Sequence, residues 1–239
     1  CKVAIRIFMK FGPLIFGATL LFATAFANAN IPVRQELSSR ADKIFSQYSF
    51  EIWRSQSAEN RENYKKFENF LRDRQVLNVV PTYQLLRTAS DAGMCRESAF
   101  EVPPMKFWDN IVTTLVYIRD YVKPELGALE AMSGYRNPTL NACASGAPRS
   151  AHTEYYALDL IPVHDMPRKE LFYKICRAHE KHGEEYHIGL GFYSGLRFHV
   201  DSRSYRRWGF NGRGITSPCV YYDLPNDGNQ TANASNATQ

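Results

Sequence analysis

The pattern of hydrophobic and polar positions divides the chain into a helical first part and a mixed second part. Residues 31–77 are rich in charged and polar side chains, and their aromatic residues recur at helical spacing, which predicts two or three amphipathic helices. Two further helices are expected. Residues 82–92 follow Pro81, which suits a first helical turn, and residues 106–122 should end before Pro124.

After Pro124 the pattern becomes typical of strands. Residues 126–133 predict a short strand, residues 156–163 a strand ending near Pro162, and residues 188–193 and 196–201 a hairpin around Ser194 and Gly195. Residues 167–182 predict a helix between these strands. The sequence therefore predicts an α+β fold, with a small antiparallel sheet flanked by helices and an N-terminal helical extension packed on it.

Composition and charge exclude several classes of protein. The 239 residues are 44% hydrophobic and 22% charged, as expected for a globular domain with a small appendage. The formal charge of +5 falls to +2 without residues 1–29, which hold three bases and no acids, so nucleic-acid binding through bulk charge is not expected. Residues 225–239 contain no aromatic side chain, and we expect a disordered tail there.

The N-terminus predicts export. Basic residues up to Lys10 precede an apolar run, and Ala25, Ala27 and Ala29 offer small-residue cleavage patterns, so residues 1–29 are interpreted as a signal peptide. The alternative is a retained membrane anchor, but the apolar run is shorter than the roughly 20 residues that a span requires. No stable membrane span is expected after cleavage, and the predicted location is periplasmic or secreted.

Four cysteines remain after the predicted cleavage. An even number in an oxidising compartment favours two disulfides, for which three pairings are possible. We favour Cys95–Cys143 with Cys176–Cys219, and the alternative is buried free thiols.

The strand phase brings candidate metal ligands together. In residues 196–201 alternation sends Phe198 and Val200 into the core and turns Arg197, His199 and Asp201 to the opposite face. The same alternation puts Asp159 on the open face of residues 156–163. With His152 from a nearby loop, two imidazoles and one carboxylate can meet at a point, which is typical of a hydrolytic zinc site with one open position.

Three motifs in order resemble a known family. They are Ser133-Gly-Tyr-Arg136, then Ser150-Ala-His152 followed by Ala157-Leu-Asp159, and finally Phe198-His-Val-Asp201. Over residues 100–210 the chain is similar to the zinc D-Ala-D-Ala carboxypeptidases, D-Ala-D-Ala dipeptidases and murein endopeptidases. Gly189-Leu-Gly-Phe-Tyr and Arg206-Arg-Trp208 resemble the endopeptidase branch. Tyr155 departs from the pattern, because glycine is usual at its position.

The resemblance implies a role for each site residue. His152, Asp159 and His199 would bind Zn2+, and Arg136 would hold the scissile carbonyl and stabilise its negative charge. Ser150 would orient the ligand loop or contact the substrate. Tyr135 flanks the first motif, where an aromatic ring suits the wall of a peptide groove, and the alternative for it is ordinary packing. Many relatives place a glutamate where this chain has Leu196. Asp201 is therefore our candidate general base, the alternative being a carboxylate that orients His199.

These inferences define an expected function. The chain should be an exported zinc metallopeptidase that hydrolyses amide bonds next to D-amino acids in peptidoglycan peptide stems, as a carboxypeptidase or an endopeptidase. The alternative is a non-catalytic zinc-containing module that binds cell wall or protein. The expected divisions are a signal peptide (1–29), a helical extension (30–100), a zinc peptidase-like domain (101–224) and a tail (225–239). We expect Trp208 to be a core anchor, the alternative being a platform for substrate. We expect His179 and His182 to lie on a solvated helix face, the alternative being a shared metal ion.

Overall fold

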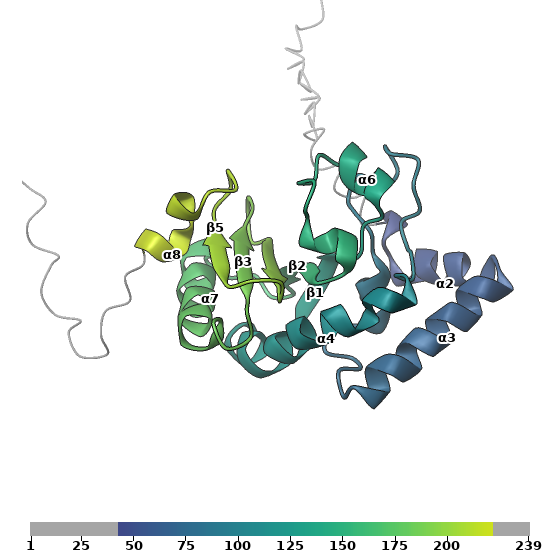
Figure 1. The fold of residues 1–239 in the computed structure, drawn as a ribbon, viewed down its shortest axis with the longest axis horizontal. Coiled ribbons are helices and arrows are strands. Elements are labelled where there is room, and N and C mark those ends of the chain that lie inside the picture. Colours follow the sequence, from purple (N-terminus) through teal and green to yellow (C-terminus); the bar gives the residue numbers. More distant parts are fainter. Residues whose placement is uncertain (1–42, 222–239) are drawn as a thin grey trace, which may run out of the picture.

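The computed structural model describes residues 43–221, so the predicted signal peptide and the predicted tail lie outside the described residues. It is an α+β fold, in which helices flank a five-stranded mixed sheet and a helical segment precedes it (Figure 1). The predicted fold class is confirmed. No helix within these residues is both long and apolar enough to cross a membrane.

Two helices of the N-terminal part form as their pattern predicts. They are α2 (Gln47–Ser55) and α3 (Ala58–Asp73), and Ser46 and Ser57 cap them by accepting backbone N–H groups of the first turns. Their buried side chains do not form a separate core. Phe50 packs against Phe100, and Phe67 packs against Trp108, so a continuous hydrophobic core joins these helices to the rest of the fold.

The helix predicted for residues 82–92 is wrong beyond its first turn. Only a 3-10 helix, Thr82–Leu86, forms there. The backbone of Arg87 is then extended and pairs with Phe100 in an antiparallel bridge. Its buried guanidinium donates hydrogen bonds to the carbonyl oxygens of Phe45 and Ala131 and to Glu130. These tertiary bonds outweigh the local preference for helix in this segment.

The helix predicted for residues 106–122 does not stop before Pro124. A 3-10 turn, Met105–Phe107, leads into α4 (Trp108–Tyr117), a π-helical turn, Ile118–Val122, and α5 (Lys123–Leu126). The wide π turn leaves Pro124 in the first turn of α5, where its missing N–H costs no helical hydrogen bond. The strand predicted for residues 126–133 consequently begins later, at Leu129.

The sheet has five short strands: β1 (Leu129–Ser133), β2 (Ala157–Pro162), β3 (Gly189–Phe192), β4 (Phe198–Asp201) and β5 (Arg206–Trp208). Their order is β1-β2-β4-β3-β5, and all neighbours are antiparallel except β3 and β5. The predicted hairpin is confirmed as β3 and β4. The parallel pair was not predicted. Since β2 already pairs with one edge of β4, the chain returns to the free edge of β3 and runs parallel to it.

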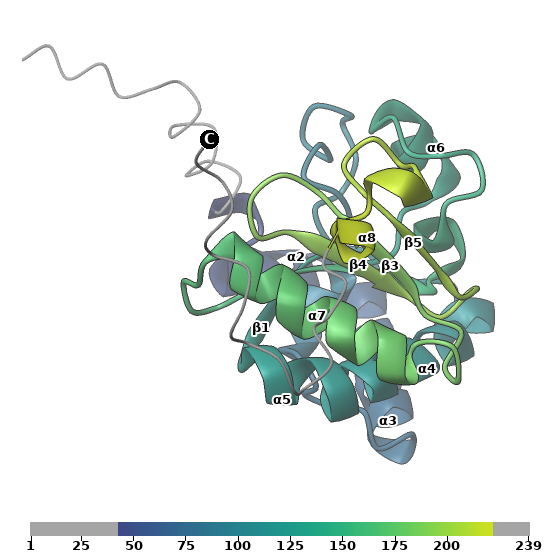
Figure 2. The same cartoon turned by 90° about the vertical axis from the view of Figure 1, so that its left-hand side faces the viewer.

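The two faces of the sheet differ, as the strand phase predicts. Leu158, Leu160, Phe198 and Val200 are fully buried. Phe192, opposite Phe198, packs edge-on against Phe172 of α7 (Arg168–His182), which runs along this face (Figure 2). The other face carries Asp159 and His199, which lie directly opposite each other on β2 and β4. The sheet therefore separates a hydrophobic layer from a polar site.

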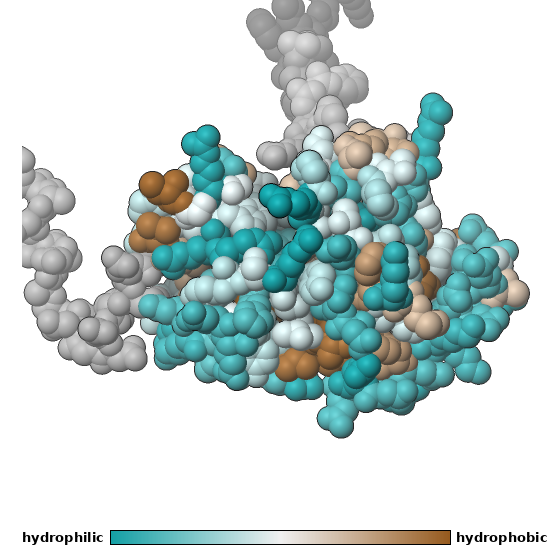
Figure 3. All heavy atoms as spheres, viewed as in Figure 1, coloured by the Kyte–Doolittle hydropathy of each residue, from teal (hydrophilic) through white to brown (hydrophobic). Residues whose placement is uncertain are grey.

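Two disulfides complete the fold, and the favoured pairing is confirmed. Cys95–Cys143 ties the loop after residue 87 to the end of α6 (Pro138–Cys143), and Cys176–Cys219 ties α7 to α8 (Pro218–Tyr221). Both fit an oxidising compartment. The visible face of the molecule is largely hydrophilic, with separate hydrophobic spots such as those near η5 (Gly214–Thr216) and α8 (Figure 3).

Candidate metal centre and its pocket

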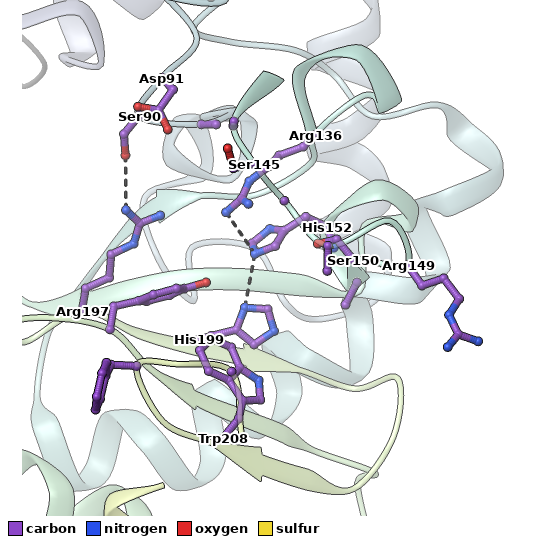
Figure 4. Close-up of a pocket in the computed structure, with 18 of the residues that line it drawn as sticks. Ser90, Asp91, Arg136, Ser145, Arg149, Ser150, His152, Arg197, His199 and Trp208 are labelled. Carbon is purple, nitrogen blue, oxygen red and sulfur yellow. Dashed lines mark hydrogen bonds between the residues drawn. The ribbon is translucent and has the colours of Figure 1, made fainter. Parts of the chain in front are cut away.

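The three predicted ligands converge. One nitrogen from each of His152 and His199 and one carboxylate oxygen of Asp159 lie within 4.8 Å of one another. The nearest pairs are Asp159 Oδ1 with His199 Nδ1, at 3.0 Å, and His152 Nε2 with His199 Nδ1, at 3.2 Å. Figure 4 shows the contact between the two histidines as a dashed line. None of the three residues is more than 4% exposed. This part of the chain could therefore hold a metal ion.

Backbone geometry places His152 in this group. It lies in a short 3-10 helix, Ala151–Glu154 (η4), whose first N–H groups are capped by Ser150, as its Oγ accepts the N–H of His152. The Nδ1 of His152 donates to the carbonyl oxygen of Gly134, at 2.6 Å. Since a carbonyl oxygen only accepts, the proton is on Nδ1, and the lone pair of Nε2 faces the site.

The His199 ring is also oriented by a hydrogen bond, which in this residue is made by Nε2. Its Nε2 donates to Asp201 Oδ2, at 2.8 Å, so that Nδ1 faces Asp159 and His152. Two imidazole lone pairs and a carboxylate oxygen thus point at a common position, with a hydrogen-bond acceptor behind each ring. Such partners behind the rings are the usual surroundings of metal-binding histidines. The donor set fits a divalent ion such as zinc.

The protonation states of two of the three ligands favour metal binding. For the third, His199, burial would lower the pKa, but the hydrogen bonds with Asp159 and Asp201 outweigh burial and raise it, so that a metal ion would have to displace a proton from this ring. Burial, followed by the charge of Arg136, lowers the pKa of His152 to about 4, so this ring is neutral at pH 7. Burial alone would raise the pKa of Asp159, but the adjacent His152, His199 and Arg197 hold it well below the usual range of a carboxyl. Asp159 is therefore ionised over the whole physiological range.

Two arginines hold the carboxylate of Asp159. The Nη2 atoms of Arg136 and Arg197 each donate to Oδ2 at 2.6 Å, which leaves Oδ1 directed at the histidines. Arg136 is also anchored by Ser133 Oγ and lies 3.3 Å from His152 Nε2. This places a permanent positive charge beside the ligand group, where a polarised carbonyl could be stabilised.

Asp201 lies behind His199 and away from the other ligands. It is fully buried and makes a two-point ion pair with Arg206, and its Oδ1 accepts the backbone N–H of Arg203. Burial would raise its pKa, but His199 and Arg206 outweigh this and lower the pKa to about 2. The geometry fits the alternative role, a carboxylate that orients His199. The general-base role has no support from this position, because so acidic a group accepts protons weakly.

Of the remaining predicted site residues, one lines the pocket and the other does not. Ser150 lines the pocket above the ligands, whereas Tyr135 does not. The Tyr135 side chain is 5% exposed and packs between Phe107 and Tyr155, so its predicted contact with substrate is not supported. Trp208 was expected in the core, but it is half-buried, lines the pocket and lies 5.4 Å from the His199 ring between centroids. Gly191 leaves room for the indole, because a Cβ there would overlap it.

The prediction for one of the two helix histidines is wrong. His179 is only 2% exposed, its Nε2 donates to the carbonyl oxygen of Ile188, and it stacks on Tyr205. It therefore fixes the approach to β3 and does not lie on a solvated face. His182 is half-buried and stacks on Tyr121.

The sequence interpretation missed several groups at the site. Tyr193 donates a hydrogen bond to Asp159 Oδ1, Arg206 pairs with Asp201, and Ser90 and Asp91 line the pocket. Alternation through Gly189, Gly191 and Tyr193 is a signal that could have placed the tyrosine. No local pattern identifies Ser90 or Asp91, because their position depends on the long-range folding of residues 87–100 against β1.

The two histidines of the ligand group line a cavity of about 620 Å³, whereas Asp159 is completely buried behind them. The walls of the cavity come from residues 89–91, from the loop 144–151, and from residues after β3 and in and after β5. A cavity of this size accommodates a short peptide segment. In comparisons with known proteins, no family model, no curated protein and no solved structure matches the chain.

Proposed function

We propose that the chain is an exported zinc metallopeptidase that hydrolyses amide bonds next to D-amino acids in peptidoglycan peptide stems, as a D,D-carboxypeptidase or an endopeptidase. The observation that carries this proposal is the buried group of His152, Asp159 and His199, with Arg136 beside it and with both histidines lining an accessible pocket. The order of the three motifs adds support, and the two disulfides support a location outside the cytoplasm.

Each residue has a physical role in this proposal. His152, Asp159 and His199 would hold zinc, which supplies an activated water and polarises the scissile carbonyl. Arg136 stabilises the negative charge that develops on the carbonyl oxygen. Arg197 and Tyr193 keep the Asp159 carboxylate in place. Burial and the adjacent Asp159 raise the pKa of Tyr193, so its hydroxyl stays protonated and acts as a hydrogen-bond donor.

A second candidate function has its own supporting observation. Leu196 occupies the position at which a glutamate is usual in the resembling family, and Asp201 is turned behind His199. With no acidic residue of the described chain identified as a base beside the ligands, a zinc-bearing module that binds cell-wall peptides without turnover is the alternative.

One experiment separates the two functions. Purified protein is incubated with muropeptides, with and without a chelator, and the products are analysed by mass spectrometry. Loss of a terminal D-Ala or cleavage of a crosslinked dimer, abolished by the chelator, supports the enzyme. An inert protein that retains one zinc supports the module.

Metal analysis tests the ligand set directly. We expect near-stoichiometric zinc in the wild type and little in the His152→Ala and Asp159→Ala variants, with His187→Ala as a loop control. Equal zinc in all four proteins would contradict the assigned ligands, and with them the proposed function.

A further inference from the structure

Several arginines line the pocket, together with one acidic side chain that the ligand group does not use. The arginines are Arg136, Arg149, Arg197 and Arg206. The buried Asp159 and Asp201 are already paired with three of them. Asp91 is the carboxylate that remains among the lining residues.

The Asp91 carboxylate has no direct partner in the described part of the chain. It is half-buried, and no side-chain hydrogen bond or ion pair within residues 43–221 engages it. Arg197 interacts with it only through space, because the Nη atoms of Arg197 donate to Asp159 and to Ser90 Oγ. A partly desolvated carboxylate at a cavity wall gains most from a cationic partner.

The backbone holds Asp91 in place. The carbonyl oxygen of Asp91 accepts the N–H of Cys95, and the turn is closed by a bond from Ala92 N–H to the carbonyl oxygen of Ala89. The Cys95–Cys143 disulfide then fixes this turn to the end of α6, directly before the opposite pocket wall. Asp91 is therefore a preorganised part of the pocket.

Asp91 lies one residue from a hydrogen-bond chain that leads to the candidate metal ligands. Its neighbour Ser90 accepts a hydrogen bond from Arg197, at 3.2 Å, and Arg197 donates to the ligand Asp159, at 2.6 Å. Figure 4 shows Asp91 and Arg149 on opposite sides of His152. A bound peptide would thus meet a negative group on one side of the ligands and a positive group on the other.

We propose that Asp91 binds a cationic amine of the substrate, so that the pocket selects peptides with a free side-chain ammonium on the residue that precedes the D-Ala-D-Ala pair. This inference rests on the proposed function and adds to it one residue, Asp91, that selects the charge of the substrate. A charge-assisted hydrogen bond of this kind is worth roughly tenfold in affinity or more.

The test uses two peptides that differ only in this charge, acyl-Lys-D-Ala-D-Ala and its Nε-acetyl-lysine counterpart. The zinc-loaded wild type should show a kcat/KM roughly tenfold higher for the free amine. Asp91→Asn should abolish the preference by lowering kcat/KM for the free amine alone, with unchanged zinc content. Asp165→Asn, which removes an exposed carboxylate outside the pocket, should keep the preference.

Equilibrium binding of the peptides keeps the inference testable when no peptide is hydrolysed. It can be measured by tryptophan fluorescence, because Trp208 lines the pocket. In that case the proposed activity fails, but a wild-type preference for the amine that Asp91→Asn removes still supports the amine site. The inference is overturned if the wild type binds both peptides equally, or if Asp91→Asn weakens both equally, as loss of a general base or of the fold would do.

Discussion

Tyr155 explains how this chain departs locally from the motif that it resembles. Its backbone has φ of 59°, the left-handed region in which glycine is favoured. The side chain compensates for this strain, because it is fully buried, contacts Phe67 and donates a hydrogen bond to the carbonyl oxygen of Leu85. An aromatic residue is thus accommodated where α3 packs against the end of the short helix that carries His152.

Replacing Tyr155 should therefore destabilise the protein. Tyr155→Gly relieves roughly 1 kcal/mol of backbone strain but removes a buried aromatic ring worth about 3–5 kcal/mol, so we expect a net loss of about 2–4 kcal/mol. Urea unfolding measures it. Tyr155→Phe keeps the ring and should lose only about 1 kcal/mol. A Tyr155→Gly variant as stable as wild type would show that the ring does not stabilise this conformation.

Asp201 permits a prediction about the metal. If it holds His199 in the binding tautomer, Asp201→Asn should weaken zinc binding by about 10–100-fold, as measured by competition with a chromogenic chelator. Asp165→Asn removes an exposed carboxylate outside the pocket, and this variant should bind zinc as the wild type does. Unchanged affinity in Asp201→Asn would show that the tautomer of His199 is set without this carboxylate.

At the scale of elements, the two disulfides form a natural matched pair. They close loops of similar length, with sequence separations of 48 and 43 residues, so the loop-entropy model gives each about 4 kcal/mol of stability. Only Cys95–Cys143 joins two walls of the pocket. Cys176–Cys219 joins α7 to α8, behind the sheet.

We expect the two double serine variants to lose similar stability in urea unfolding but to differ in peptide binding. Cys95→Ser with Cys143→Ser should weaken peptide affinity, because the walls at residues 89–91 and 144–151 are no longer tied together. Cys176→Ser with Cys219→Ser should leave it unchanged. Equal affinities in the two folded variants would contradict a role of the first disulfide in shaping the pocket.

The sequence predicted the strands better than the helices, for a physical reason. Alternation along residues 196–201 is a local signal, and it placed His199 and Phe198 on opposite faces correctly. The extended conformation at Arg87 depends instead on Phe45 and Ala131, which are distant in sequence. The same limit applies to the site: the motifs predicted the three residues that converge and Arg136, whereas Asp91 reaches the pocket only through this long-range packing.

At the scale of the whole molecule, the part of the chain before residue 100 helps to hold the site in place. Gly134 follows β1, and its N–H donates to the carbonyl oxygen of Arg87, while a Cβ at Gly134 would lie 2.6 Å from that of Leu85. The carbonyl of Gly134 in turn orients His152. Residues before 100 therefore help to position a candidate metal ligand as well as the pocket wall.

This continuity predicts a single cooperative unfolding transition. Because Phe50 and Phe67 share a core with Phe100, Trp108 and Tyr155, the segments on either side of residue 100 should unfold together, with coincident changes in circular dichroism and tryptophan fluorescence. A fragment of residues 101–239 with Cys143→Ser, which removes the unpaired thiol, should fail to fold and to bind zinc stoichiometrically. A fragment that unfolds cooperatively and retains zinc would show that the first hundred residues are dispensable for the metal centre.

In the full chain, an excess of zinc should raise the unfolding midpoint by mass action, since only the folded protein brings the three ligands together.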